Sequence, residues 1–565
     1  MRGKVFDVAV YCVAVSIALA ASVGTAAASR RHPSDGRSPR PNDVLLSPSV
    51  ASVSTRGAFT AHGPGFSTGS FYGDISSSGR YVVFESPSSR LDPSSPPPAE
   101  DYWGVFLRDN VEGTTKRIDV APSSRYELLG DSHQLPRISD DGRYVITAED
   151  VLLPDGTIRE GLFRYDRVAD AIAPITAFSP SRLAMTSRLS VDAAGDRAAW
   201  LGWGRLTNGS WGAGVWLWSQ ATGKVRDLVT TTDGQELRMI GGSVTLSADG
   251  RQLAFVGQPQ NLVSTPSEPP ASPQLYTMPT TGTAVPSAML TPQSDLPNYG
   301  VEVDDGSAMS GDGRYVAYTS RSTNITRSCQ GDCPAAEYWQ THVFAWDRES
   351  GAVIQVDPVL ADPDGAAATI GSDGDGSMST DGSKLVITYR TDPVHFAIGV
   401  VYGTTDTYLA DLQKSSLERF TVGWHGGENI SSAENTRISG DGQYVVFDAI
   451  DNHLVPGDNN DTVDVFDSAV ADAPSVALTA STKRHSLRFH WQNPERFREV
   501  QVRLGRGTHS IPCRHCGRRL YAGRKATAAA GQLRSHTRYT VAVYTILKSG
   551  RILSRKVAVA QTHTH

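Results

Sequence analysis

One serine lies in a pattern that hydrolases use for their nucleophile. Gly65-Phe66-Ser67-Thr68-Gly69 matches Gly-x-Ser-x-Gly, a motif that needs a strand before it and a helix after it to expose the hydroxyl. Here the flanking residues read as a flexible connector, and no alternation of strands and helices is evident in the chain. We therefore assign Ser67 no role as a nucleophile and predict no catalytic residues.

Two other groups of residues have the chemistry to hold a metal ion. Asp458–Asp464 and Asp373–Asp375 are rich in oxygen ligands but lack the spacing of an EF-hand loop, and Asp, Asn and Gly are also ordinary turn residues. The histidines of the central region share no repeat position and no helical spacing, at His62, His133, His342, His395, His425 and His453. We predict neither a metal site nor a cofactor.

Four of the five cysteines form two tight pairs along the chain. Cys329 and Cys333 enclose three residues, and Cys513 and Cys516 form a Cys-x-x-Cys. In an oxidising compartment such neighbours form local disulfides, and we predict one within each pair. The alternative for the second pair is a zinc site that also uses His509 or His515, although one Cys-x-x-Cys supplies only half of a usual ligand set.

The strands and turns that would position these residues belong to a unit that repeats along the chain. An apolar residue, a short polar turn ending in glycine and an apolar strand recur seven times, as in Ile138-Ser-Asp-Asp-Gly142-Arg-Tyr-Val-Ile-Thr147. The glycines stand at 79, 142, 195, 250, 313, 382 and 442. Five of the seven turns read Asp-Gly, a strong hairpin signal because glycine accepts positive φ.

The strand after each turn is apolar at consecutive positions, as in Tyr81-Val82-Val83-Phe84. A strand buried on one face would alternate, so continuous apolarity indicates that both faces are covered. A second strand pair follows in each unit, for example across Gly104–Ile118 and His342–Val356. Four strands at a long regular period predict an all-β fold, a seven-bladed β-propeller.

These units resemble the TolB-like (WD-type) propeller repeat, whose hallmark is Ser-x-Asp-Gly-(Arg/Lys) followed by an apolar strand. The resemblance covers about residues 70 to 475 and implies a fold rather than an activity, because such propellers serve as scaffolds, gates and enzymes. The remaining segment resembles a fibronectin type III domain. There Trp491 matches the core tryptophan and Tyr539 matches the tyrosine corner, which implies a small β-sandwich.

The predicted organisation has four parts. Residues 1–28 have a positive start, an uncharged run and a small-residue end, as a secretory signal peptide does; an uncleaved membrane anchor is the alternative. Residues 29–42 read as a linker, 43–474 as the propeller and 475–565 as the fibronectin type III-like sandwich. The seventh blade takes its outer strand either from Ser475–Ala480 or from a returning segment at Asp43–Pro48, and we favour the second.

Charge divides the molecule. Residues 475–565 contain 18 Lys or Arg and two acids, whereas the rest of the chain contains 35 bases and 57 acids. Such asymmetry indicates electrostatic partners. The basic tail would bind an anionic cell-wall polymer or nucleic acid, or rest on the acidic propeller, and a solvated surface without a partner is the alternative. We predict no specific nucleic-acid partner, and a membrane only if the signal stays uncleaved.

Aromatic residues recur in the loops between the second and third strands of three repeats. They are Tyr102, Trp103, Trp211, Tyr338 and Trp339. Equivalent positions in a propeller lie on one rim, where flat rings stack on sugars or anchor a protein partner. The alternative is that each ring packs on its neighbouring blade.

We therefore predict a secreted or cell-envelope-associated, non-catalytic binding and scaffold protein. Its propeller would recognise an extracellular glycan or protein, and its basic sandwich would hold anionic surfaces. The alternative is a metal-dependent polysaccharide lyase or a glycosidase with its site in the propeller funnel.

Overall fold

The computed structural model describes residues 49–50, 69–96, 103–120, 127–130, 136–176, 189–205, 211–228, 243–257, 274–281, 287–288, 307–320, 325, 342–356, 367–369, 377–390, 405–413, 416–419, 433–449, 460, 462–470, 479–483, 485–490, 499–506, 518–546 and 552–561. Every regular element in this part of the chain is a strand, and the strands pair in antiparallel fashion throughout it. The all-β prediction is confirmed. Within these residues there is no helix, and hence none that is long and apolar enough to cross a membrane.

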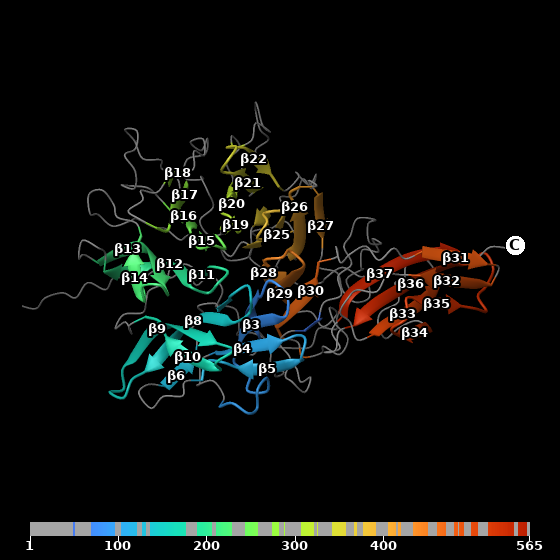
Figure 1. Ribbon diagram of the computed structural model, residues 1–565, viewed down its shortest axis with the longest axis horizontal. Coiled ribbons are helices and arrows are strands. Elements are labelled where there is room, and N and C mark those ends of the chain that lie inside the picture. Colours follow the sequence, from blue (N-terminus) through green and yellow to red (C-terminus); the bar gives the residue numbers. More distant parts are fainter. Residues whose placement is uncertain are drawn as a thin grey trace, which may run out of the picture.

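The first three glycine-marked repeats each form one sheet (Figure 1). Sheet 1 contains β2 (Phe71–Ile75), β3 (Tyr81–Ser86), β4 (Gly104–Asp109) and β5 (Thr114–Arg117). Sheet 2 contains β6 (Glu127–Gly130), β7 (Arg137–Ile138), β8 (Tyr144–Leu152), β9 (Ile158–Asp166) and β10 (Ala171–Pro174). Sheet 3 contains β11 (Ser190–Val191), β12 (Arg197–Arg205), β13 (Trp211–Ser219) and β14 (Lys224–Asp227).

The next four repeats do the same. Sheet 4 contains β15 (Val244–Leu246), β16 (Gln252–Gly257), β17 (Gln274–Pro279) and β18 (Ser287–Ala288). Sheet 5 contains β19 (Ser307–Met309), β20 (Tyr315–Ser320), β21 (His342–Asp347) and β22 (Val353–Gln355). Sheet 6 contains β23 (Ala367–Thr369), β24 (Ser377–Met378), β25 (Lys384–Arg390), β26 (Thr405–Asp411) and β27 (Ser416–Arg419). Sheet 7 contains β28 (Ala433–Ile438), β29 (Tyr444–Ala449) and β30 (Asp464–Ala469), with β1 (Ser49–Val50) at its edge.

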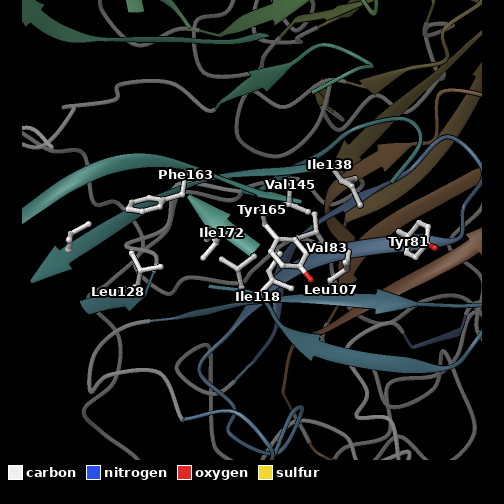
Figure 2. Close-up of a cluster of buried hydrophobic side chains, with 12 residues drawn as sticks. Tyr81, Val83, Leu107, Ile118, Leu128, Ile138, Val145, Phe163, Tyr165 and Ile172 are labelled. Carbon is white, nitrogen blue, oxygen red and sulfur yellow. The ribbon is translucent and has the colours of Figure 1, made fainter. Parts of the chain in front are cut away.

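The sheets pack on one another in a circle. One hydrophobic cluster lies between each sheet and the next, and another, which includes Val82 and Val446, joins the seventh sheet to the first. Figure 2 shows the cluster between sheets 1 and 2, where Val83 and Leu107 face Val145 and Tyr165. All six residues of β3 are buried, as the continuous apolar pattern predicted. This radial packing is the arrangement of a β-propeller.

The Ser-x-Asp-Gly turn has a repeated internal bonding pattern. In sheet 2 the hydroxyl of Ser139 donates to the carboxylate of Asp141 at 2.6 Å, and the N–H of Arg143 donates to the same carboxylate oxygen at 2.9 Å. The N–H of Tyr144 donates back to the Ser139 hydroxyl oxygen at 2.9 Å. In the five sheets that have it, the motif therefore specifies the hairpin between the strands on either side of it, and its Asp and Ser are occupied within the turn.

The arginine after the turn glycine ties the second strand of a sheet to the third. Arg143 donates to Asp166 through Nε at 3.2 Å and Nη2 at 2.9 Å. Hydrogen bonding from the Arg143 guanidinium is the main reason why the pKa of the Asp166 carboxyl is lowered to about 2. Sheets 1 and 5 repeat the arrangement, through Arg80 with Asp109 and Arg314 with Asp347.

A strand from the N-terminal side of the repeats completes sheet 7. Ser49 and Val50 pair with Asp467 and Phe466 of β30. The ring is therefore tied by a returning N-terminal strand, as we favoured, but at residues 49–50; the predicted segment 43–48 lies outside the described residues. Residues 1–28 and 29–42, assigned to the signal and linker, also lie outside them.

The C-terminal segment forms two further sheets. One has the order β31 (Thr479–Lys483), β32 (Ser486–His490), β35 (Thr527–Ala530), and the other has the order β34 (Arg518–Gly523), β33 (Glu499–Arg506), β36 (Arg538–Ile546), β37 (Ile552–Gln561). Leu487 and Phe489 from the first sheet and Val500 and Val502 from the second share one buried cluster. The hydroxyl oxygen of Tyr539 accepts the N–H of Arg534 at 3.0 Å, the contact that a tyrosine corner makes. Trp491, the predicted core tryptophan, lies outside the described residues.

Candidate functional site

A narrow channel runs where the first strands and turns of the seven sheets meet, with a volume of about 110 Å³. Figure 1 shows β11, β15, β19 and β28 on this inner side of their sheets. The residue after the turn serine, or after Asp192 in sheet 3, takes part in a ring of backbone hydrogen bonds. The N–H of Ser77 donates to Asp140 O, that of Asp140 to Ala193 O, and that of Ala193 to Ala248 O, each at 2.9 Å. On the opposite side Gly311 donates to Thr380 O at 2.7 Å and Thr380 to Gly440 O at 2.8 Å. These bonds fix the channel wall.

The charged part of the wall comes from three successive sheets. Asp74 of β2 lies between sheets 7 and 2, because Arg437 Nε of β28 donates to its Oδ1 at 2.7 Å and the N–H of Ile138 donates to its Oδ2 at 3.0 Å. The Asp74 side chain is 9% exposed. An ion pair this shielded is held strongly only when further hydrogen bonds satisfy the carboxylate, and the Ile138 amide provides one.

Arg137 of β7 occupies the same repeat position as Asp74 and Arg437. Its Nε donates to Leu189 O at 2.9 Å and its Nη1 donates to Pro136 O at 3.2 Å. The equivalent positions of sheets 3, 4 and 6 contain the hydroxyl residues Ser190, Thr245 and Ser377. At this repeat position, sheets 7, 1 and 2 therefore present charged side chains, and sheets 3, 4 and 6 present small hydroxyl groups.

Asp140 is the acid with the most perturbed environment in the channel. Burial, together with the nearby carboxylates of Asp74 and Asp441, raises the pKa of its carboxyl to about 6. Its Oδ2 is 2.9 Å from the point where a Cβ on Gly440 would stand, and Thr380 Oγ1 and Ser77 Oγ are 2.8 and 3.0 Å from the same point. Three polar side chains from three sheets thus converge at one end of the channel, and only a glycine fits beside them.

Asp192 stands where the six other repeats have the turn serine. Its Oδ1 accepts the N–H groups of Asp196 and Arg197 at 2.8 and 3.0 Å. Burial raises the pKa of its carboxyl, and these two hydrogen bonds oppose the rise. Its role is therefore that of a turn-stabilising residue that also lines the channel.

Among the described residues no group of three or more His, Cys, Asp or Glu is placed to hold a metal ion. His342, the one candidate histidine in the described ranges, has its Nδ1 3.2 Å from Gln355 Nε2 on the adjacent strand. The acid run at 373–375 lies outside those ranges, and of the run 458–464 only residues 460 and 462–464 lie within them. Chemically, the wall offers guanidinium, carboxyl and hydroxyl groups that suit the binding of a polar group.

Two of the five aromatic residues predicted to form a rim, Trp103 and Trp211, lie in the described ranges. Trp103 precedes β4, and its ring centroid is 5.0 Å from that of Phe71 at a tilt of 45°, so this ring packs on its own sheet. Trp211 begins β13 opposite Arg205 of β12. Tyr102, Tyr338 and Trp339 lie outside the described residues, as do Ser67 and the four paired cysteines Cys329, Cys333, Cys513 and Cys516.

The channel residues were not singled out from the sequence. A signal exists, because Asp74, Arg137 and Arg437 each stand immediately before the apolar residue that opens the turn motif. A charged residue at that offset is unexpected in a first strand that is otherwise buried. Only alignment of the seven units on their turn glycines brings the three residues into one column.

A second candidate surface lies on the C-terminal sheets. Exposed bases in the described residues are Arg488, Arg506, Arg518, Arg519, Arg524, Lys525, Arg534 and Arg538. The apolar residues of β33 alternate into the core as Val500, Val502 and Leu504. The bases are consequently left on the outside of a small apolar core.

No family model matches the chain, and no curated protein matches its sequence. Solved structures of similar fold include an oligogalacturonate lyase from Vibrio parahaemolyticus, at 11% identity and a TM-score of 0.41, covering 76% of this chain and 98% of that one. A protein assigned as TolB from Agrobacterium tumefaciens has 15% identity and a TM-score of 0.31, over 63% and 94% of the two chains. Prolyl oligopeptidase B from Galerina marginata has 8% identity and a TM-score of 0.40, and the match spans 75% of this chain and about half, 55%, of that one. Likeness at this level concerns the fold alone.

Proposed function

We propose that this chain is an exported, non-catalytic binding protein. Its propeller recognises an extracellular glycan or protein, and its fibronectin type III-like C-terminal sandwich holds it against an anionic surface such as a cell-wall polymer. The N-terminal 28 residues act as a cleaved signal, and the two cysteine pairs close as local disulfides after export.

The observation that carries this proposal is the division of charge. The C-terminal 91 residues hold 18 bases and two acids, and the described bases of this segment stand outside the apolar core. A domain with this excess of one sign repels itself and gains from an oppositely charged partner. The acidic remainder of the chain favours presentation of the propeller away from an anionic surface.

Binding rather than turnover is supported by how the channel groups are used. Asp74 is engaged by Arg437 and by the Ile138 amide, Arg137 by two carbonyl oxygens and Asp192 by two turn amides. Groups held in this way by structural contacts are suited to orient a ligand. The aromatic loop residues Tyr102, Trp103, Trp211, Tyr338 and Trp339 are proposed to supply stacking contacts on one rim of the propeller.

A retention experiment tests the proposal. Purified mature protein is passed over immobilised polyphosphate, polygalacturonate and a neutral glucan at rising salt. We expect retention on both polyanions that weakens as salt increases, because exposed charges are screened, and none on the neutral glucan. Release of unsaturated or reducing sugar from polygalacturonate is followed in parallel, with metal analysis of the protein. Turnover together with a stoichiometric divalent ion would establish the lyase alternative, and absence of retention on every polyanion would refute the anchoring role.

A further inference from the structure

We propose that Arg503 and Arg519 form an oxyanion-binding site on the outer face of the sheet β34–β33–β36–β37, specific for the phosphate or carboxylate groups of an anionic polymer. The proposal rests on the anionic-surface role given above and assigns it to two residues. It follows from the position of the two side chains, their mutual charge and an unsatisfied donor atom.

The alternation of β33 decides which face Arg503 occupies. Val502 and Leu504 on either side of it belong to the buried cluster between the two sheets. Since successive side chains of a strand point to opposite faces, Arg503 lies on the face away from the core. Gln501 shares that face, and its Nε2 donates to Glu499 Oε1 at 2.9 Å.

The strand register sets two like charges side by side. Arg503 is opposite Arg519 of β34, at a bulge that follows Val502. Directly opposite residues on one face have Cβ atoms about 5 Å apart, and like charges there destabilise a sheet. Burial lowers the pKa of the Arg503 guanidinium, and the charge of Arg519 lowers it further. Within the described residues, neither arginine has a carboxylate partner.

The Nε atom of Arg503 is shielded from solvent and has no hydrogen-bond partner among the described residues. Tyr544, which is opposite Gln501 on the same face, is only 2% exposed, whereas Arg503 as a whole is half-buried. A buried donor without a partner destabilises the fold, and more so when the group is charged. An anion on this face would satisfy that donor and relieve the repulsion between the two arginines.

The ligand chemistry follows from the donors. Two neighbouring guanidinium groups present planar N–H forks that match the oxygens of phosphate and carboxylate groups in bidentate fashion. A repeated anion along a polymer would place one group between Arg503 and Arg519, and the surrounding exposed bases would add only non-specific attraction. The site therefore predicts saturable binding of a single small oxyanion as well as polymer binding.

The test uses the full mature chain with Arg503→Gln, Arg519→Gln and the matched control Arg488→Gln, which removes the same charge from an exposed position of β32. Inorganic phosphate and acetate are titrated by calorimetry at constant ionic strength, and polyphosphate and polygalacturonate are compared as polymers. We expect the first two variants to weaken phosphate and polymer binding about tenfold, and the control less than about twofold. A preference for polyphosphate or polygalacturonate identifies which oxyanion the site selects.

A fourth variant separates binding from folding. Arg519→Glu places a carboxylate opposite Arg503, so we expect a higher melting temperature together with loss of phosphate binding. Equal weakening by all three glutamine variants, or phosphate binding that survives Arg519→Glu, would overturn the site while leaving polymer anchoring intact. Phosphate binding without any polymer retention would instead refute the anchoring function and keep the site.

Discussion

Tyr81 of sheet 1 packs directly beneath Gly142 of sheet 2, so that its Cδ2 is 2.2 Å from the point where a Cβ on Gly142 would stand. The glycine has φ +69°. The same relationship joins Tyr144 to Gly195, Tyr315 to Gly382 and Tyr444 to Gly79. The turn glycine thus serves two purposes, since it forms the hairpin of its own sheet and receives the aromatic ring of the sheet before it.

Gly142→Ala is expected to destabilise the protein by about 3 kcal/mol, from the positive φ and from the overlap with the Tyr81 ring. Gly156→Ala is the matched control, because Gly156 has φ +80° and nothing within 4 Å of its Cβ position; it should cost about 1 kcal/mol. Urea unfolding measures both. Equal costs for the two variants would show that the interlocking with Tyr81 contributes no stability.

Asp74 joins the seventh, first and second sheets, so its loss should affect the closure of the ring. We expect Asp74→Asn to lower the free energy of unfolding by about 3 kcal/mol, because the shielded Arg437 guanidinium loses its ion pair. Asp109→Asn breaks the pair with Arg80, whose side chain is 38% exposed, and should cost about 1 kcal/mol or less. A double-mutant cycle of Asp74→Asn with Arg437→Gln gives the coupling energy, and a value near zero would contradict the proposed link.

The raised pKa of the Asp140 carboxyl leads us to expect a specific dependence of stability on pH. Its folded-state pKa, raised to about 6, exceeds the unfolded value of about 3.9. The folded chain therefore holds the proton more tightly, and its contribution to stability is present below about pH 4 and is lost as the pH rises to about 6. Asp140→Asn should stabilise the protein by about 2 kcal/mol at pH 7 and change little at pH 4.

The control for this pH effect is the neighbouring Asp141→Asn. Asp141 accepts the Ser139 hydroxyl and the Arg143 amide within the turn, so its replacement should destabilise the protein at pH 7 by about 1 kcal/mol. Thermal unfolding between pH 4 and 8 compares the two variants. A destabilising Asp140→Asn at pH 7 would mean that the carboxylate has a partner that keeps it charged.

Trp103 tests the proposed aromatic rim. If its indole stacks on a ligand, Trp103→Ala should weaken ligand binding about tenfold, whereas Trp103→Phe should retain most of it. Phe71→Leu serves as the control, because it removes the ring that contacts Trp103 in the fold. Affinity for the ligand found in the retention screen is measured alongside the melting temperature. A loss of stability without any loss of affinity would assign Trp103 to packing alone.

The sequence determined the elements through local chemistry. Each Ser-x-Asp-Gly turn contains its own hydrogen-bond partners, as Ser139, Asp141 and Gly142 show, so five hairpins could be placed from residue order alone. The other two could be placed from their turn glycines, Gly79 and Gly195. The consecutive apolar residues of Tyr81–Phe84 likewise predicted a strand covered on both faces, which its burial confirms. The approximate position of the basic C-terminal part followed from charge counting.

Only the tertiary structure decided which residues meet across the ring. Asp74 and Arg437 are 363 residues apart, and nothing local pairs them until the seventh sheet closes on the first. Arg503 and Arg519 become neighbours only through a bulged register, which a two-residue periodicity does not specify because a shift by one residue exchanges the faces of a strand. Contacts between sheets depend on loop closure and the packing of whole faces, and these are properties of the assembled ring.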